Sequence, residues 1–400
     1  MPALISPHEA RTLIRHHIVT NPIEDCSLLN CNGRILAQSI VADRDFPPFD
    51  RSMMDGYALC AQELAAGQPL KIVGQAAAGS PQMQLPIAEK ACIEIMTGAI
   101  IPQHADCVVP YESVEPMDPT KIRIPQPASF ARGDYIHPKG SDLPQGSEIL
   151  PVGTRIGSRQ AAILATCGYD SVRVYQQSKI AIITTGDELV PVTKKPALQQ
   201  IRRSNDHCIR HALTAHQIES SLPVHLADDP QLCKKGLADQ IENHSVLIIS
   251  GGVSRGKKDF IPETLTELGF HCHFHGVAQK PGKPFGFWTR PGRVVFTLPG
   301  NPVSTLTCLH AYVLPALDLQ MGQIPPRRQS LHLRQPIASH QRLTRFIPVR
   351  VENRGEASAQ MTQNSGDMIR ILASNGFIEV PKASPEQTTQ SGEFDYYPWK

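Results

Sequence analysis

The sequence contains no apolar run that approaches the roughly 20 residues needed to span a bilayer. Its first residues, MPALISPHEARTLIRHH, lack the basic-then-apolar order of a signal peptide. The net charge is also close to zero, since the sequence has 39 basic and 37 acidic residues. This balance argues against the cationic surface that non-specific nucleic-acid binding requires. We therefore expect a soluble, cytoplasmic protein that binds neither membranes nor nucleic acid.

The ten cysteines are scattered and contain no C-x-x-C pair, the closest two being Cys26 and Cys31. This spacing is typical of reduced thiols in a cytosolic protein rather than of a disulfide framework. The run His271-Cys-His-Phe-His275 would place its three histidines on one face of a strand, because alternate residues of a strand point the same way. A metal-binding triad is one interpretation, and we favour the other, a polar face on an edge strand.

The length of 400 residues predicts two or three domains, and the composition changes along the chain. Residues 6–17 predict a helix, with Ser6 as N-cap and Pro7 at the first helical position. From 44 to 138, prolines and glycines separate short apolar segments, a pattern that predicts an all-β domain. A further helix is predicted over 158–166, closed by Gly168.

From 179 to 321, apolar strand-like runs alternate with helical patterns. Strands are predicted at 180–183, 246–249 and 294–298, and helices at 204–215, 262–268 and 303–317, with another helix capped by Asp229. This alternation predicts a parallel sheet covered by helices on both faces. The remainder, to Lys400, predicts short β-strands and one possible helix near 367–374.

Glycine- and proline-containing turns adjoin these predicted strands, at residues 184–188, 250–254, 281–284 and 299–302. Because ligands of open α/β sheets bind at the carboxyl ends of the strands, the turns predict one pocket. Lys280 and Lys283 place two cations on a short rigid loop, as an anionic ligand requires. The backbone N–H groups of Ser250-Gly-Gly-Val-Ser254 suit a phosphate or a pterin.

Asp187 and Glu188 follow a predicted buried strand, where paired carboxylates can hold Mg²⁺ together with substrate phosphates. Their alternative roles are a turn cap for Asp187 and a solvated surface position for Glu188. Ser304 is predicted to cap the helix over 303–317, whose N-terminus favours an anion. Asp259 has an alternative role as the cap of the helix that contains Pro262.

The same turns resemble the MoeA family, the molybdopterin molybdenumtransferases, to which the gephyrin E domain belongs. The similar segments are ITTGDELVPV, SGGVSRGKKDF, KPGKPFGF and LPGNPVSTL, with FPPFDRSMMDGYAL, IMTGAIIPQHADCVVPYE and GSDLPQGSEILPVGTRI upstream and QNSGDMIRILASNGFIEVP downstream. They cover nearly the whole chain in the expected order, so the resemblance is specific.

The resemblance implies a multidomain protein of the α+β and α/β classes. An N-terminal linker and helical domain would comprise 1–43 and 139–178, interrupted by an inserted β-rich domain over 44–138. A MoaB/MogA-like, three-layer α/β domain that binds molybdopterin would follow over 179–321, and a small C-terminal β-barrel over 322–400.

The resemblance also implies the reaction: molybdate and adenylylated molybdopterin (molybdopterin-AMP) would be the substrates, molybdenum cofactor and AMP the products, and Mg²⁺ a cofactor. A homodimer with shared sites would bring Asp55, Thr97 and Asp142 from the partner subunit. Other proteins of molybdenum cofactor biosynthesis are further candidate partners. The implied catalytic residues are Asp55, Thr97, Asp142, Glu188 and Asp259; the substrate-binding residues Gly186, Ser250, Gly251, Gly252, Ser254, Lys280, Lys283, Pro299, Pro302, Ser304, Arg350 and Ser365; the metal ligands Asp187 and Glu188.

The chain departs from the family pattern in two places. Arg255, Lys257 and Lys258 replace a more neutral or acidic stretch, and Phe346-Ile-Pro348 stands where the family has Phe-x-Arg, leaving only Arg350. Two alternatives therefore stay open: a molybdopterin adenylyltransferase, and a non-catalytic cofactor-binding or scaffolding paralogue. Molybdate and tungstate are not distinguished by the sequence, because they share charge and nearly share size.

Overall fold

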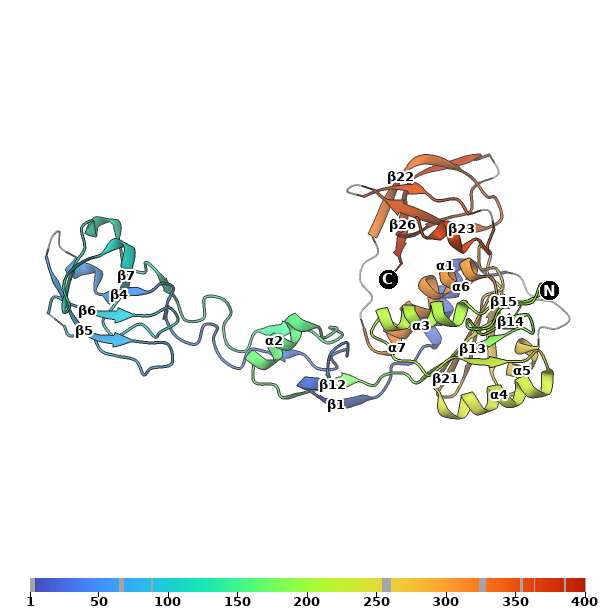
Figure 1. Cartoon of the computed structure of the whole chain (residues 1–400), viewed down its shortest axis with the longest axis horizontal. Coiled ribbons are helices and arrows are strands. Elements are labelled where there is room, and N and C mark those ends of the chain that lie inside the picture. The colour runs from blue at the N-terminus through green and yellow to red at the C-terminus, as the bar shows by residue number, and fades with distance from the viewer. Residues whose placement is uncertain are drawn as a thin grey trace. The chain divides into compact units, whose positions relative to one another are not determined.

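The computed structural model describes residues 4–64, 68–87, 89–253, 260–323, 329–352, 355–362, 364–384 and 386–399. Contacts within the chain define two compact units (Figure 1). Unit 1 comprises Met1–Gln38, Val152–Ala161 and Ser171–Lys400, and unit 2 comprises Ser39–Pro151 and Ala162–Asp170. Within the described ranges, no helix is long and apolar enough to cross a membrane. The boundaries of the four domains named above stay a prediction.

Unit 1 begins with helix α1 (Pro7–His17), which confirms the first predicted helix. Ser6 caps it, and a capping box forms because Glu9 and Ser6 each accept from the other's backbone N–H. Strand β1 (Ile23–Ser27) leads into the turn η1 (Leu28–Asn30) and pairs antiparallel with β12 (Ser171–Tyr175). Helix α2 (Ser158–Thr166) crosses the boundary between the units and ends before Gly168 at φ +79°, as predicted.

The central sheet of unit 1 has six strands. Its order is β16 (Val224–Leu226), β13 (Ile180–Thr185), β17 (Val246–Ser250), β21 (Arg293–Leu298), β20 (Gly286–Arg290) and β18 (His271–His275). The first four strands are parallel, but β20 and β18 are antiparallel to their neighbours, so the prediction of a parallel sheet is wrong for that edge. The reason is the short turn after Arg290, since a parallel pair needs a crossover of a dozen or more residues.

Helices cover both faces of this sheet, as predicted (Figure 1). One face packs against α3 (Asn205–Ala215) and a helical run of α6 (Pro302–Cys308), the π-helical segment η5 (Leu309–Val313) and α7 (Leu314–Gln320). The other face packs against α4 (Pro230–Asn243) and α5 (Ile261–Glu267). The predicted cap is confirmed, because the Asp229 carboxylate accepts from two backbone N–H groups of α4.

The C-terminal region forms the predicted small barrel. Its strands are β23 (Thr344–Val351), β24 (Glu356–Ala359), β22 (Gln329–Ala338), β26 (Thr389–Pro398) and β25 (Gly376–Val380), and the pairing of β25 with β23 closes the ring. The short helix α8 (Met368–Ile371) lies within the segment predicted to be helical. Strand β19 (Gln279–Lys280) adds to β23 in parallel and so ties the barrel to the segment that enters β20.

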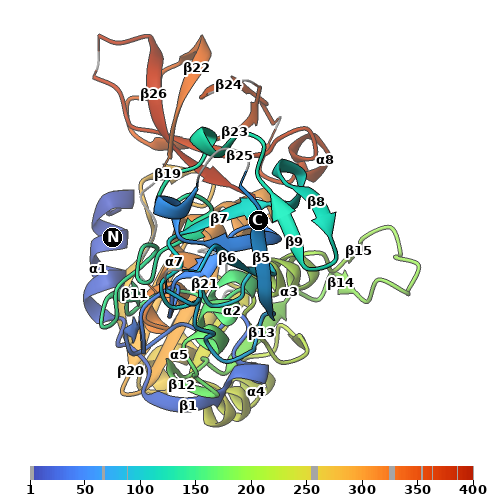
Figure 2. The same ribbon diagram turned by 90° about the vertical axis from the view of Figure 1, so that its left-hand side faces the viewer.

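Unit 2 is built on a six-stranded sheet, drawn in blue to teal in Figure 2. Its order is β7 (Cys107–Pro110), β4 (Gly56–Leu59), β6 (Ala91–Ile95), β5 (Leu70–Ala76), β9 (Lys121–Arg123) and β8 (Glu115–Asp118). Two ribbons join β3 (Arg51–Ser52) to β10 (Ile136–His137) and β2 (Ile40–Val41) to β11 (Glu148–Leu150). The all-β prediction is confirmed. Besides strands, the described part of 44–138 contains as helical elements only the short 3₁₀ turns η2 (Ala61–Glu63), η3 (Tyr111–Ser113) and η4 (Pro127–Ser129).

The histidine run forms the predicted edge strand β18, but the prediction that its three histidines share a face is wrong. His271 and His273 lie together, with ring centroids 4.7 Å apart, but the register shifts between Cys272 and Phe274, and His275 packs near Trp288 instead. His273 contacts Thr289 Oγ1 at 2.7 Å, whereas His275 contacts the Val253 carbonyl at 2.7 Å. The described residues contain no group of three or more His, Cys, Asp or Glu side chains placed to hold a metal.

Candidate functional site

A cavity of about 1060 Å³ lies in unit 1 at the carboxyl ends of β13, β17 and β21. These ends are level, because Thr184 pairs with Ser250 and Ser250 with Leu298. The antiparallel β20 begins at the same edge, since Gly286 pairs with Thr297. All four predicted turns contribute to the lining. The predicted residues among it are Gly186, Glu188, Ser250, Gly251, Gly252, Lys280, Lys283, Pro299, Pro302, Ser304 and Ser365.

Two of the turns require glycine. Gly251 has φ +97°, and a Cβ there would lie 2.5 Å from the backbone oxygen of Thr185. Gly282 has φ +94°, and its Cβ would lie 2.5 Å from Gln279 Nε2 and 2.6 Å from Cys308 Sγ. No side chain fits at such distances, so glycine is what lets these backbones close around the cavity.

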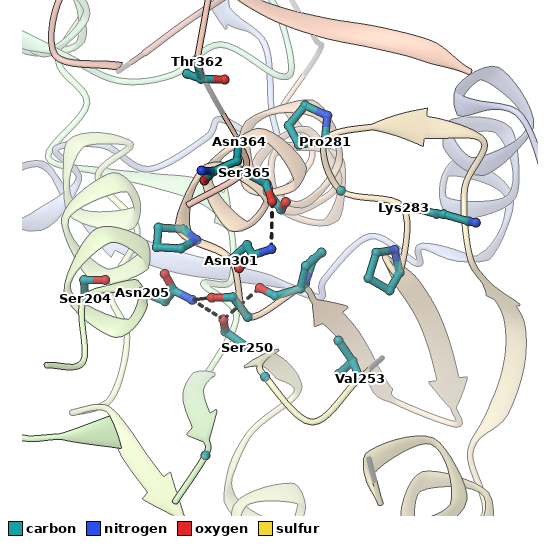
Figure 3. A pocket seen from close by; sticks show the side chains of 18 of the residues that line it. Ser204, Asn205, Ser250, Val253, Pro281, Lys283, Asn301, Thr362, Asn364 and Ser365 are labelled. Atoms are coloured by element: carbon teal, nitrogen blue, oxygen red, sulfur yellow. Dashed lines mark hydrogen bonds between the residues drawn. The ribbon is translucent and has the colours of Figure 1, made fainter. Parts of the chain in front are cut away.

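Two separate hydrogen-bonded pairs of polar side chains line the cavity, Asn205 with Ser250 and Asn301 with Ser365 (Figure 3). Asn205, at the start of α3, donates from Nδ2 to Ser250 Oγ at 2.8 Å and to the Gly300 carbonyl at 2.8 Å. Asn301 donates from Nδ2 to Ser365 Oγ at 2.8 Å, which joins the turn after β21 to the segment before α8. The sequence prediction included Ser250 and Ser365 but missed the two asparagines that hold them.

The prediction that Ser304 caps the helix is wrong. The helix begins one residue earlier, with Asn301 as the N-cap and Pro302 at the first position, so Ser304 lies in the first turn and is 4% exposed. The Val303 N–H in this turn donates to the Ser365 carbonyl at 3.0 Å. Ser304 still lines the cavity.

Cationic side chains gather where the sheet domain meets the barrel. In the β19–β23 pair, Lys280 stands opposite Arg345, and both line the cavity. Arg345 donates from Nη1 to the Ala338 carbonyl at 2.6 Å, and its burial lowers the pKa of its guanidinium. Like charges opposite one another in a sheet are unfavourable, so a bound anion would stabilise this pair.

Arg350 differs from its prediction. It is exposed, pairs with Ser358 in the barrel and is absent from the described lining of the cavity, in contrast to Arg345. The physical reason is position along β23: the strand passes the cavity at its start, over 343–348, and Arg350 lies beyond it. Pro348, which stands in place of the family's arginine, does line the cavity.

Lys283 lies on the far side of the cavity from Ser204 and Asn205, and its side chain extends away from them (Figure 3). It is exposed and belongs to the lining. Two further arginines that line the cavity, Arg202 and Arg203, were missed by the sequence reasoning, although both immediately precede the predicted helix at 204–215.

Carboxylates occupy the β13 side of the cavity. Glu188 folds back over Gly186, so that a Cβ at Gly186 would lie 2.8 Å from both Glu188 carboxylate oxygens. Asp228, after β16, also lines the cavity, whereas Asp187 is outside the described lining. Asp187 and Asp228 are joined: each carboxylate accepts from the other's backbone N–H, at 3.2 and 3.4 Å. Asp228 was missed because no strand was predicted over 224–226, where the structure has β16.

A buried hydroxyl also faces this region. Thr185 is 4% exposed and lines the cavity, and its Oγ1 has no hydrogen-bond partner among the described residues. Buried polar atoms are rarely left unpaired in native structures. The orphaned hydroxyl therefore fits a cavity that binds a polar ligand.

Three predicted catalytic residues lie in unit 2. Asp55 and Thr97 are brought together, because the Thr97 N–H and Oγ1 both donate to Asp55 Oδ1, at 2.6 and 2.8 Å. These bonds, the backbone one first, lower the pKa of the Asp55 carboxyl. Asp142 Oδ1 contacts His137 Nε2 at 2.8 Å, and the His137 Nδ1 lies 3.2 Å from Arg51 Nη2.

Two predicted site residues, Ser254 and Asp259, lie outside the described residues, as do Arg255, Lys257 and Lys258. Their assignments stay predictions.

The chain is thus a multidomain α/β protein with a ligand site at the carboxyl edge of its sheet. Its parts are the sheet domain with the polar cavity, the closed barrel and the β-rich unit. Comparison with known families agrees. Residues 5–168 match the MoeA N-terminal region (domain I and II), residues 181–319 a probable molybdopterin binding domain, and residues 330–394 the MoeA C-terminal region (domain IV).

Named relatives extend over most of the chain. It is 40% identical to a molybdopterin molybdenumtransferase of Synechocystis sp., over 92% of this chain and 93% of that one. A protein of the same name from Staphylococcus aureus is 30% identical over 91% of this chain and 88% of its own. A crystal structure of the molybdopterin biosynthesis moeA protein from Pyrococcus horikoshii OT3 superposes with a TM-score of 0.80, at 27% identity, over 99% of this chain and 100% of that one. This chain belongs to the MoeA family, and it is a transferase of molybdenum cofactor biosynthesis.

Proposed function

We propose that this transferase inserts molybdenum into adenylylated molybdopterin, taking molybdate as the second substrate and releasing molybdenum cofactor and AMP. The observation that carries the proposal is the charge content of the cavity lining, which combines Lys280 and Arg345 of the β19–β23 pair with the carboxylates of Glu188 and Asp228, beside which Arg202 and Arg203 also lie. Both substrates are anionic, and a site that must bind an oxyanion beside a pyrophosphate needs cations for the anions and carboxylates for a bridging metal ion. The names of the relatives support the same reaction.

The oxyanion region comprises Lys280 and Arg345, with Lys283 nearby on the same turn. Arg345 presents a planar fork of donors that suits an oxyanion. In this proposal it takes the role that the resemblance had given to Arg350. The Asn301–Ser365 pair supplies neutral polar groups to the same cavity.

The carboxylate region fits Mg²⁺, which usually takes one or two carboxylates together with substrate phosphates. Glu188 and Asp228 would hold the ion from the cavity wall, with Asp187 fixing Asp228 through their reciprocal backbone contacts. When bound, Mg²⁺ would polarise the phosphates of the adenylate as a Lewis acid. The protein's own part is to orient the adenylate and to keep the two anions together in spite of their charge.

We further propose that the enzyme is a cytoplasmic homodimer whose sites are shared, with Asp55, Thr97 and Asp142 contributed by the partner subunit. Mixing inactive Asp55→Asn subunits with inactive Lys280→Ala subunits should then restore activity. In such a heterodimer one site carries both changes and the other carries neither. Stable heterodimers without activity would refute the shared site.

The proposed reaction is tested by single-turnover insertion with purified protein, adenylylated molybdopterin, Mg²⁺ and either molybdate or tungstate. We expect AMP release coupled to metal insertion. ATP consumption without use of molybdate would instead identify an adenylyltransferase, and tight pterin binding without turnover a non-catalytic paralogue.

The oxyanion assignment has a matched pair of variants. Arg345→Met should weaken molybdate binding, whereas Arg350→Met, on the same strand but outside the described lining, should leave it unchanged. Equal effects of the two substitutions would remove Arg345 from the site.

A further inference from the structure

A buried polar contact lies directly beneath the cationic turn. Gln279 precedes Lys280 and is 0% exposed. Its Oε1 accepts a hydrogen bond from the hydroxyl of Tyr312, and its Nε2 contacts the carbonyls of Pro281 and Gly282 at 3.2 and 3.3 Å. The side chain of Gln279 thus connects the helical run after β21 to the backbone of the turn that carries the two lysines.

The helical run is irregular where it reaches Gln279. Tyr312 belongs to the π-helical segment η5. Such segments are rare in proteins, and those that occur often lie at functional sites. The last residue of α6, Cys308, also faces the turn: its Sγ lies 3.5 Å from Gln279 Nε2 and 3.7 Å from the Gly282 carbonyl. The Tyr312 ring is fixed by stacking on Phe285 at 4.7 Å, so its hydroxyl has a defined direction.

The orientation of the Gln279 amide follows from these neighbours. Both backbone contacts are carbonyl oxygens, so the amide must present its NH₂ group to them. The opposite flip would place Oε1 against two carbonyls and leave its NH₂ toward Tyr312. Tyr312 remains a donor because burial raises the pKa of its phenol well above the usual range. The two carbonyls thus select the amide orientation, and the Tyr312 hydroxyl completes it by donating to Oε1.

We infer that Gln279 and Tyr312 are positioning residues that fix the Lys280–Lys283 turn in its anion-binding conformation. Neither need touch the substrate. The inference rests on the proposed function, because it takes the turn as part of the oxyanion site. It goes beyond that function by assigning the affinity for molybdate to a buried contact on the far side of the turn.

The first test is Tyr312→Phe, which removes the hydroxyl and keeps the ring. We expect molybdate binding, measured by calorimetry, to weaken about tenfold, the effect of one buried hydrogen bond. The KM for molybdate should rise while kcat at saturating molybdate stays near that of the unchanged enzyme. The matched control is Tyr396→Phe, which removes another buried hydroxyl, bonded to the Asn375 carbonyl in the barrel at 2.9 Å. Its molybdate affinity should be unchanged.

A double variant separates positioning from stability. Gln279→Leu with Tyr312→Phe removes both partners of the Tyr312–Gln279 bond, a replacement that tends to be nearly neutral for stability. The turn nevertheless loses its donor to the Pro281 and Gly282 carbonyls. We expect a smaller loss of thermal stability than in Gln279→Leu alone, because the Tyr312 hydroxyl is not left unpaired, together with weakened molybdate binding. This variant also keeps the test available if Tyr312→Phe alone folds poorly.

Hydrogen exchange gives a readout that is independent of the reaction. The Phe285 N–H donates to the Gly282 carbonyl and the Val277 N–H to the Lys283 carbonyl. Peptides covering 277–285 should exchange faster in Tyr312→Phe than in Tyr396→Phe. If the unchanged protein fails to bind molybdate, the proposed function falls, and the exchange experiment alone decides the positioning role. Unchanged exchange in these peptides, or equal loss of molybdate affinity in the two tyrosine variants, overturns the inference.

Discussion

Replacing Gly251 by alanine tests whether the turn after β17 depends on a close backbone approach. Two costs add at this position. A non-glycine residue in the left-handed region, here φ +97°, costs about 1–2 kcal/mol. The new Cβ would also lie 2.5 Å from the Thr185 carbonyl oxygen, a backbone atom that cannot rotate away, and such overpacking costs about 1–3 kcal/mol. The expected loss for Gly251→Ala is therefore about 2–5 kcal/mol.

Gly292 is the matched control. It lies in the turn between β20 and β21 at φ +70°, and a Cβ there meets no atom within 4 Å. Gly292→Ala should pay only the conformational cost, about 1–2 kcal/mol. The difference between the two variants then isolates the close approach to Thr185.

Denaturant titration followed by tryptophan fluorescence measures this difference. Both tryptophans of the chain, Trp288 and Trp399, lie in unit 1, so the signal follows the unit that contains Gly251. Equal midpoints for the two variants would refute the argument from close approach. A large loss of molybdate binding in Gly251→Ala alone would extend it, because Gly251 lines the cavity and Gly292 is outside its described lining.

Further predictions concern charge. Glu188→Gln should slow Mg²⁺-dependent AMP release by about a hundredfold at limiting Mg²⁺ without changing the fold, since a metal supplies several kcal/mol of charge stabilisation; normal release would exclude Glu188. Molybdate at about 100 times its Kd should stabilise the folded protein by about 2.7 kcal/mol. The Lys280→Ala variant should lose most of this stabilisation by molybdate. Its stability without ligand should stay equal or rise, because the repulsion between Lys280 and Arg345 is relieved. A fall in unliganded stability would instead indicate a purely structural lysine. Burial, then His17, His271 and His16, lower the pKa of His273 from 6.5 to about 4. Between pH 6.5 and about 4 the unfolded chain therefore binds more protons than the folded one, so the stability of the fold should fall as pH drops through this window. His273→Gln should make that fall less steep. A thermal midpoint with the same pH profile in this variant would contradict the role of His273.

Local chemistry made several features predictable. Ser6 and Pro7 predict the start of α1, and Asp229 and Pro230 predict the start of α4. Both are local signals, because a capping side chain accepts from the free backbone N–H groups of the first helical turn. Three strands of the sheet, β13, β17 and β21, were recognisable as continuous apolar runs, since both of their faces are covered by helices. The turns at their ends require glycine or proline, and these residue types are enough to indicate which segments line the cavity.

The sequence by itself determined many of the elements and the turns that line the site, because these follow from contacts between residues close along the chain. Only the tertiary structure decided which distant side chains meet there. Arg345 rather than Arg350 lines the cavity because β19 pairs with the start of β23, and Asp228 lines it because β16 lies beside β13. The partnership of Gln279 with Tyr312 likewise depends on a π-helical segment that no local pattern announces. Register and helix irregularity arise from packing of the whole unit, so a pattern of neighbouring residues does not contain them.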